Sequence, residues 1–71
     1  MNKHTDNQIC ITVVTGEDGR VVEYLIEPSG DAENVHDPDT AKDEHDAQDA
    51  AQGMADDVED ELGLPCPVVW I

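Results

Sequence analysis

Several residue types are scarce or absent in this chain of 71 residues. Phenylalanine is absent, one Tyr and one Trp are the only large aromatic side chains, and Lys and Arg together number three. Recognition of DNA, RNA or an anionic membrane surface normally requires a basic patch. We therefore expect no direct contact with nucleic acid and none with a membrane.

Long hydrophobic runs are also missing. No run approaches the ~20 apolar residues that a membrane-spanning helix requires, and the chain does not open on the basic and apolar segments of a secretory signal. Cys10 and Cys66 are the only cysteines and form no Cys-x-x-Cys motif. A cytoplasmic protein with reduced thiols is expected.

Acidic residues dominate what is present. The chain has 18 Asp and Glu and a formal net charge of −15, and thirteen of these acids lie in residues 28–62, where Lys42 is the only Lys or Arg. The length allows one domain, residues 1–71. Charge asymmetry of this kind indicates a partner of opposite sign. A basic protein or complex that itself binds nucleic acid fits that description.

Two segments after a polar tail at residues 1–7 are typical of β-strands. Residues 8–15 and 20–27 are rich in β-branched side chains, and Gly16 and Gly19 bound a turn between them. With Thr15 opposite Arg20, one face of this hairpin at residues 8–27 becomes wholly apolar, because side chains alternate along a strand. That face holds Ile9, Ile11, Val13, Val22, Tyr24 and Ile26.

A long acidic helix is predicted for residues 39–62, after an acidic linker at residues 28–38. Asp37 is a suitable N-cap and Thr40 an alternative, while Gly63 is a natural C-terminal stop. At ~100° per residue, one side of this helix is apolar. Its members are Ala47, Ala51, Met54, Ala55, Val58 and Leu62.

Residues 66–71 complete the pattern as a final short strand. The order strand, strand, helix, strand predicts an α+β fold: a three-stranded antiparallel-type sheet of order 2-1-3, with the helix on one face and the last strand antiparallel to the first. The other face would be an apolar patch of the kind that marks contact sites, which leaves a homodimer open. Its predicted members are Val14, Val21 and Leu25, with either Val68 and Trp70 or Val69 and Ile71.

The candidate partner-binding residues are carboxylates on the helix side opposite the apolar one. Asp is a poor helix former and like charges four residues apart destabilise a helix, so helix stability does not explain them. They extend over about 21 Å of helix, a length on which a carboxylate row can imitate a phosphate strand toward a basic groove. This acidic face comprises Asp46, Asp49, Asp56, Asp57 and Asp60. Secondary candidates are Glu17 and Asp18 at the hairpin tip and Asp31, Glu33 and Asp37 in the linker.

No catalytic residue, cofactor or metal site is predicted. His36, Asp37 and Asp39 are close in sequence, but this segment lacks the third ligand and the central Gly of a calcium-binding EF-hand loop. A chain of this size with a core of β-branched residues and alanines has little room for a substrate pocket. We therefore expect a protein that is not an enzyme.

The short length, the charge of −15, the small sheet and the acidic helix together resemble the DNA-mimic inhibitors of phages and mobile elements. Anti-CRISPR proteins are the most similar class, and the hairpin, helix and terminal strand at residues 68–71 are similar to the build of several of them. The resemblance is one of type and includes no signature motif. It implies host-defence evasion in the bacterial cytoplasm, by stoichiometric inhibition at a nucleic-acid site of a CRISPR effector. The alternative is a small acidic adaptor or assembly protein that binds through its apolar sheet face or an edge strand.

Overall fold

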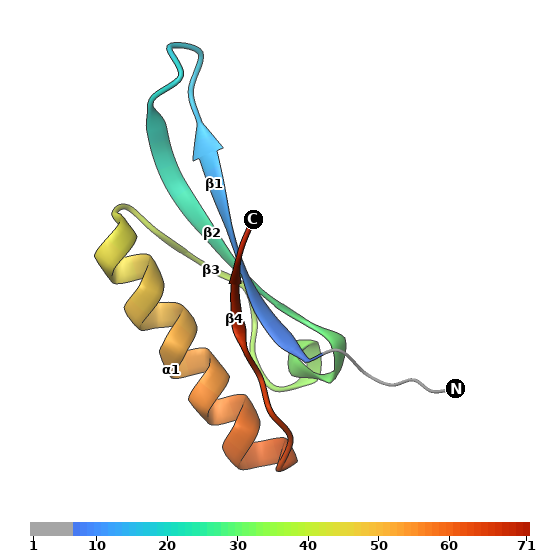
Figure 1. The fold of residues 1–71 in the computed structure, drawn as a ribbon. Coiled ribbons are helices and arrows are strands. Elements are labelled where there is room, and N and C mark those ends of the chain that lie inside the picture. The colour runs from blue at the N-terminus through green and yellow to red at the C-terminus, as the bar shows by residue number, and fades with distance from the viewer. Residues whose placement is uncertain (1–6) are drawn as a thin grey trace.

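The structure is a computed structural model that describes residues 7–71, and these form an α+β fold with one α-helix on one face of a four-stranded sheet (Figure 1). The strands are β1 (Gln8–Thr15), β2 (Val21–Ser29), β3 (Asp39–Ala41) and β4 (Val68–Trp70), the helix is α1 (Glu44–Leu62), and a 3₁₀ helix, η1 (Gly30–Asn34), follows β2. The predicted fold class is confirmed. Of the predicted tail, residues 1–6 lie outside the described residues, and Asn7 is buried rather than free in solvent.

β1 and β2 form the predicted hairpin, but its loop is one residue shorter than expected. The Gly16 carbonyl accepts a hydrogen bond from the Gly19 N–H (3.0 Å), and the Gly16 N–H donates to the Arg20 carbonyl (2.8 Å). Gly19 has φ 82°, a conformation that glycine adopts without steric cost. These features describe a three-residue loop in which the third residue forms a bulge. Gly16 therefore lies opposite Arg20.

A second offset makes the pairing differ from the predicted one by two residues. The register shifts by one residue near the end of β1, so that Ile11 lies opposite Ile26 rather than Tyr24. Because a shift of two preserves the face that each side chain occupies, the predicted inward face survives. Ile9, Ile11 and Ile26 are fully buried. Val13 on the same face is partly exposed, because the hairpin extends beyond the helix (Figure 1).

Strand β3 was not expected and changes the topology. Its residues pair antiparallel with residues 24–26 of β2, and thereby cover the free edge of that strand. Because β3 runs in the same direction as β1, α1 begins at the opposite end of the sheet from the one predicted. The last strand, β4, consequently pairs parallel to β1. The order is β3-β2-β1-β4 in a mixed sheet. The predicted placement of β1 between β2 and the last strand is confirmed, whereas the predictions of only three strands and of an antiparallel last strand were wrong.

The helix starts at Glu44 rather than at residue 39, and its N-cap is Asp43 instead of Asp37 or Thr40. The Asp43 carboxylate accepts a hydrogen bond from the Asp46 N–H at 2.8 Å, which satisfies one of the free donors of the first turn. The predicted end is confirmed. Gly63 has φ 69° and its N–H donates to the Glu59 carbonyl.

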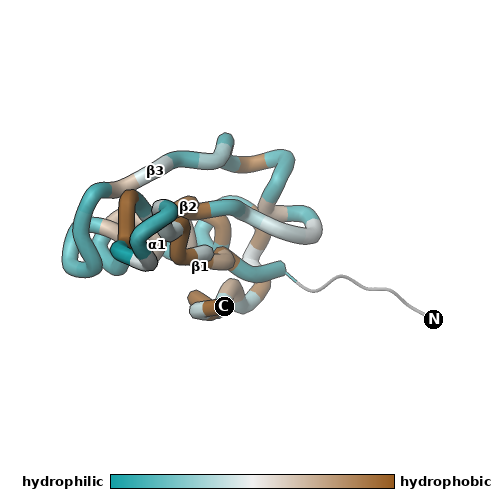
Figure 2. The backbone as a smooth tube through the Cα atoms, turned by 90° about the horizontal axis from the view of Figure 1, so that it is seen from above, coloured by the Kyte–Doolittle hydropathy of each residue, from teal (hydrophilic) through white to brown (hydrophobic). Residues whose placement is uncertain are grey.

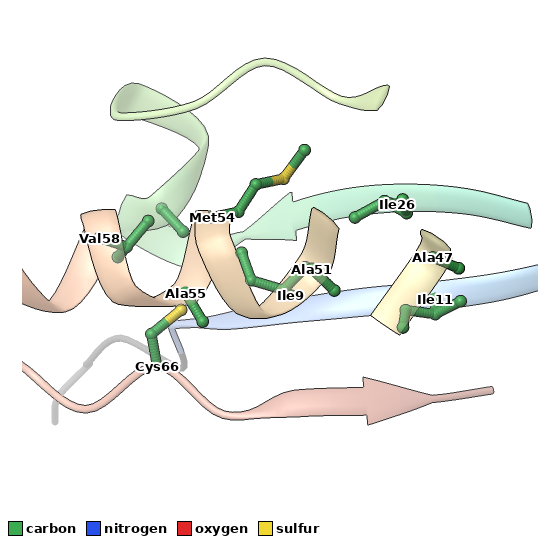
Figure 3. Packing of buried hydrophobic residues seen from close by; sticks show 10 residues of the cluster. Ile9, Ile11, Ile26, Ala47, Ala51, Met54, Ala55, Val58 and Cys66 are labelled. Atoms are coloured by element: carbon green, nitrogen blue, oxygen red, sulfur yellow. The ribbon is translucent and has the colours of Figure 1, made fainter. Parts of the chain in front are cut away.

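The helix packs on the sheet through small side chains. Ala47, Ala51 and Ala55 recur every four residues along one side of α1 and have no exposed surface. They lie against Ile9 and Ile11 of β1 (Figure 3). Because alanine side chains are small, the helix can approach the sheet closely, and its alanines pack directly against the isoleucines. The rest of the buried cluster is Ile26, Ala32, Met54, Val58 and Cys66, with Leu62 partly buried beside it.

The other face of the sheet has no helix over it among residues 7–71 (Figure 1). Figure 2 shows hydrophobic stretches along β1 and β2 and near the C-terminus. The pairing of Thr12 with Leu25 and of Cys10 with Val69 places these side chains on the open face.

Two members of the predicted apolar patch lie elsewhere. Trp70 pairs with Ile11 on the helix side, so its assignment to the same patch as Val14 and Leu25 was wrong. Val21 lies beyond the register shift, opposite Thr15. The open face therefore carries Val69 and, by alternation, Ile71 in place of Trp70.

The alanine packing leads to a test of the helix–sheet contact. Ala51→Leu should lower the free energy of unfolding by about 1–3 kcal/mol, because extra methylenes must be accommodated between α1 and β1. Urea unfolding followed by far-UV circular dichroism measures the change. Gln52→Leu, at an exposed position of the same helix, is the control and should change stability by less than about 0.5 kcal/mol. Equal effects of the two substitutions would contradict the packing described.

Candidate functional site

The surface of α1 is occupied by carboxylates with no Lys or Arg among them. All of these acids are exposed, whereas Ala47, Ala51 and Ala55 on the other side of the helix are buried. The acids are concentrated in the first six and the last six residues before Leu62. The eight acids are Glu44, Asp46, Asp49, Asp56, Asp57, Glu59, Asp60 and Glu61. Over a helix of 19 residues, about 28 Å long, this is one carboxylate for about every 3.5 Å of helix axis.

The few cationic groups of the described residues are already paired with acids. Arg20 lies 3.6 Å from Asp18 at the hairpin tip, and Lys42 lies 3.7 Å from Glu23. Neither pair includes a carboxylate of α1. No Lys or Arg of residues 7–71 therefore neutralises the helix carboxylates, which remain available to a cationic partner.

A groove of about 610 Å³ runs between α1 and the connection from η1 to β3. One wall is helical and the other is the extended segment at residues 35–39. Carboxylates stand on both walls, and apolar atoms lie between them. The lining residues are Val35, His36, Asp37, Pro38 and Asp39 on one side, and Asp49, Ala50, Gly53, Met54 and Asp57 on the other.

One contact ties the two walls together. The Nε2 atom of His36 lies 2.8 Å from the Asp57 Oδ2 atom, a contact between residues 21 positions apart in the chain. Val35 packs against the core on the same wall. His45 makes a weaker contact along the helix, 3.5 Å from Asp49. The His36–Asp57 contact therefore bridges the two walls of the groove.

The predicted acidic face divides into two sets in the structure. Asp49 and Asp57 line the groove, whereas Asp46, Asp56 and Asp60 lie on the exposed helix surface outside it. Asp56 accepts a hydrogen bond from the Gln52 side chain at 3.1 Å.

The secondary candidates are also separated. Asp37 joins Asp49 and Asp57 at the groove, but Glu17 and Asp18 are at the hairpin tip and Asp31 and Glu33 are in η1. The hairpin tip and the C-terminal end of α1 lie at opposite ends of the molecule (Figure 1). The structure therefore brings together only part of the predicted set.

Seven of the ten residues that line the groove were not predicted as site residues from the sequence, among them His36, Asp39 and Gly53. The signal for Gly53 was present, because a glycine inside a helix is unfavourable by about 1 kcal/mol relative to Ala. No local pattern could have indicated His36, because its partner Asp57 is far away in the chain.

The C-terminal half of α1 is electrostatically unfavourable in isolation. Asp60 and Glu61 lie in the last turn, where the helix dipole is negative and no basic residue is present. Asp56 and Asp60, and Asp57 and Glu61, are also like-charged pairs four residues apart. Acids in the first turn have the opposite effect, since they face the positive end of the dipole. The same residue type therefore stabilises one end of α1 and destabilises the other.

Substitutions at the two ends of α1 should therefore have opposite signs. At low ionic strength, Glu61→Gln should raise the free energy of unfolding by about 0.3–1 kcal/mol and Glu44→Gln should lower it by a similar amount. Thermal unfolding by circular dichroism measures both, with the wild type between them. Added NaCl should shrink both differences because it screens exposed charges. Destabilisation by both substitutions would argue against an electrostatic origin.

Cys66 connects the end of α1 to β4 and is 2% exposed. Its backbone N–H donates to a Glu59 carboxylate oxygen at 2.9 Å. Burial raises the pKa of the Cys66 thiol above its ordinary value of 9.0, and the negative charge of Glu59 raises this pKa further. Cys10 is also a free thiol and is half-buried on the open sheet face. Of the two thiols, Cys66 is the one that the fold shields from solvent.

This raised pKa has a consequence for stability at alkaline pH. Above about pH 9 the unfolded chain loses the Cys66 proton while the folded chain retains it, so the unfolded state binds fewer protons and the free energy of unfolding falls as pH rises.

The influence of Glu59 on the Cys66 thiol can be tested by substitution. Glu59→Gln keeps an oxygen that can accept from the Cys66 N–H but removes the charge. In a Cys10→Ser background it should speed alkylation of Cys66 by iodoacetamide at pH 9 relative to the parent. An unchanged rate would mean that Glu59 does not influence the thiol.

Trp70 lies in β4 and is not part of the groove. Its ring meets Tyr24 edge to face, with centroids 5.9 Å apart and an interplanar angle of 83°. The indole N–H donates to the Gln48 side-chain oxygen of α1 at 3.0 Å. Trp70 therefore joins β4 to the helix, although 40% of its surface is exposed.

Comparison of this chain with protein-family models, with curated proteins and with solved structures found no match. Among residues 7–71, no group of three or more His, Cys, Asp or Glu is arranged to hold a metal ion. Within the same residues, α1 is not apolar enough to cross a membrane.

Proposed function

We propose that this protein is a non-catalytic inhibitor that occupies the basic nucleic-acid groove of a host defence complex by imitating phosphates. The observation that carries the proposal is the charge density of α1. Averaged over the helix, this is one carboxylate for about every 3.5 Å of axis, close to the ~3.4 Å between successive charges along one DNA strand, although no acid lies between Asp49 and Asp56. A groove built to bind a phosphate strand would meet a comparable average density of negative charge on a rigid support.

The cost of this charge to the protein itself supports the proposal. Acids in the last turn of α1 oppose the helix dipole and repel one another, so they weaken the fold that carries them. Solubility alone does not require them at these positions, because acids elsewhere on the surface would serve equally well. A basic partner removes the repulsion by forming charge-assisted hydrogen bonds with the carboxylates.

The resemblance to anti-CRISPR proteins makes a CRISPR effector the first target to test. Association would be steered by opposite charges and would weaken with salt. A restriction enzyme, a polymerase or a repressor has a basic groove of the same kind. These classes are the next targets in the same assay.

The adaptor function is the second candidate, because apolar residues remain on the uncovered sheet face. Ile71 is 73% exposed there, and Val14, Leu25 and Val69 are half-buried. Binding or homodimerisation through this face would depend on apolar area and would respond little to salt. Salt dependence therefore separates the two candidates.

Displacement of DNA tests the proposed inhibition directly. Increasing amounts of the protein should release fluorescent DNA from a purified CRISPR effector–guide complex, as measured by anisotropy, and the effect should fade as NaCl is raised. The variant Asp46→Asn/Asp56→Asn/Asp60→Asn should require about tenfold more protein, if each lost ion pair contributes a few tenths to 1 kcal/mol. The fold of the variant is verified by circular dichroism.

A charge-matched pair of variants removes two charges from α1 or two charges elsewhere. Asp56→Asn/Asp60→Asn should displace DNA less well than the wild type, whereas Glu23→Gln/Glu27→Gln, in β2 and outside the candidate binding residues, should displace it nearly as well. Equal loss in both variants would show that only net charge matters. Absence of displacement from every nucleic-acid-binding target would refute the proposed function.

A further inference from the structure

The groove between α1 and residues 35–39 differs from the rest of the acidic surface in being concave and only partly acidic. Acidic residues line both walls, with Asp37 and Asp39 on one wall and Asp49 and Asp57 on the other. Val35 and Met54, between these acids, present apolar atoms. Among residues 7–71, these acids are not grouped so that three or more could hold one metal ion. A side chain with an apolar stem and a cationic head matches both parts of the lining.

Gly53 provides an independent observation. It lies near the middle of α1, where glycine is a poor helix former, and a Cβ atom built on it would meet nothing within 4 Å. Close packing inside the protein therefore does not require glycine at this position. Its effect is to leave the backbone of α1 open to the groove, as happens where a ligand approaches a helix closely.

The groove is also preformed. The contact of His36 with Asp57 at 2.8 Å holds the extended wall against the helix, and it engages only one of the two Asp57 carboxylate oxygens. A site whose walls are fixed before binding loses less conformational entropy when it is occupied. The groove is therefore better suited to specific recognition than a loose acidic surface would be.

We propose, on the basis of the proposed function, that this groove receives an arginine side chain from the basic partner. The guanidinium has five N–H donors in a planar fork that can meet carboxylates on both walls, and its methylene stem can lie over Val35 and Met54. The partner's arginine would thus be anchored in the groove, while the exposed carboxylates outside it, Asp46, Asp56 and Asp60, contact other basic groups. In this arrangement the groove determines how the two proteins align, and the other carboxylates of α1 provide the long-range attraction.

The probe for the test is an end-capped Gly-Arg-Gly peptide, followed by two-dimensional amide NMR of the isotope-labelled protein. Chemical-shift changes should concentrate on residues 35–39 and 49–57. The same peptide with citrulline in place of arginine has nearly the same shape but no charge, and should cause no comparable change. Shifts spread evenly over the hairpin tip, η1 and α1 would overturn the proposal.

Substitutions at Gly53 separate the groove from general charge attraction. Gly53→Leu keeps the net charge and places an apolar side chain in the groove, so it should weaken peptide binding by up to about fivefold, the equivalent of one lost ion pair. Gly53→Ala adds only a methyl group and should bind like the wild type. Both replace glycine with a better helix former, so both retain the fold. Equal affinity of the Leu and Ala variants would refute the groove as the site.

The DNA-displacement assay distinguishes failure of this inference from failure of the proposed function. If Gly53→Leu displaces DNA as well as Gly53→Ala while the triple Asp→Asn variant does not, the acidic helix acts without the groove and this inference is wrong. If Gly53→Leu alone loses displacement, the arginine anchor is supported. If the wild type displaces no DNA, the proposed function fails, and the peptide titration still decides whether the groove binds arginine.

Discussion

The contact between the alanine side of α1 and the isoleucines of β1 and β2 is the interaction on which the rest of the structure depends. Ala47, Ala51 and Ala55 lie against Ile9 and Ile11 with no exposed surface. This small apolar core has to hold together a chain with a net charge of −15. It does so by placing every helix carboxylate outside the contact, so that no charge is desolvated. The same contact fixes α1 as a rigid support, and thereby fixes the spacing of the carboxylates and the position of one groove wall.

Much of the fold could be predicted because its signals are local. The alternation of residues 8–15 and 20–27 identified the hairpin and its buried face, and Gly63 identified the end of the helix. The exact pairing could not be predicted, because it depends on two offsets of one residue each, one in the loop around Gly19 and one at the end of β1. Their sum preserves the faces, which explains why Ile9, Ile11 and Ile26 were correctly predicted to share the buried face although the pairing was wrong.

The topology was missed for a different reason. Strand β3 has only three residues, Asp39–Ala41, and they show no hydrophobic alternation. Its formation depends on the free edge of β2, and an edge belongs to the assembled sheet rather than to the local sequence. Once that strand forms, the direction of α1 and of β4 follows. The candidate site shows the same division: the acids of α1 were recognisable from helical periodicity, whereas the groove requires His36 to meet Asp57 across 21 positions.

The repulsion among Asp56, Asp57, Asp60 and Glu61 links the free state of the protein to its bound state. In the free protein this repulsion is unrelieved, and any cation that gathers around the end of α1 lowers it. Polyamines and magnesium ions in a cell would form such an atmosphere without occupying a defined site. On the proposed function, a target must then displace these small cations, whose release adds entropy to the association. The affinity for a target would therefore depend on the ionic composition of the surrounding solution as well as on the two surfaces in contact.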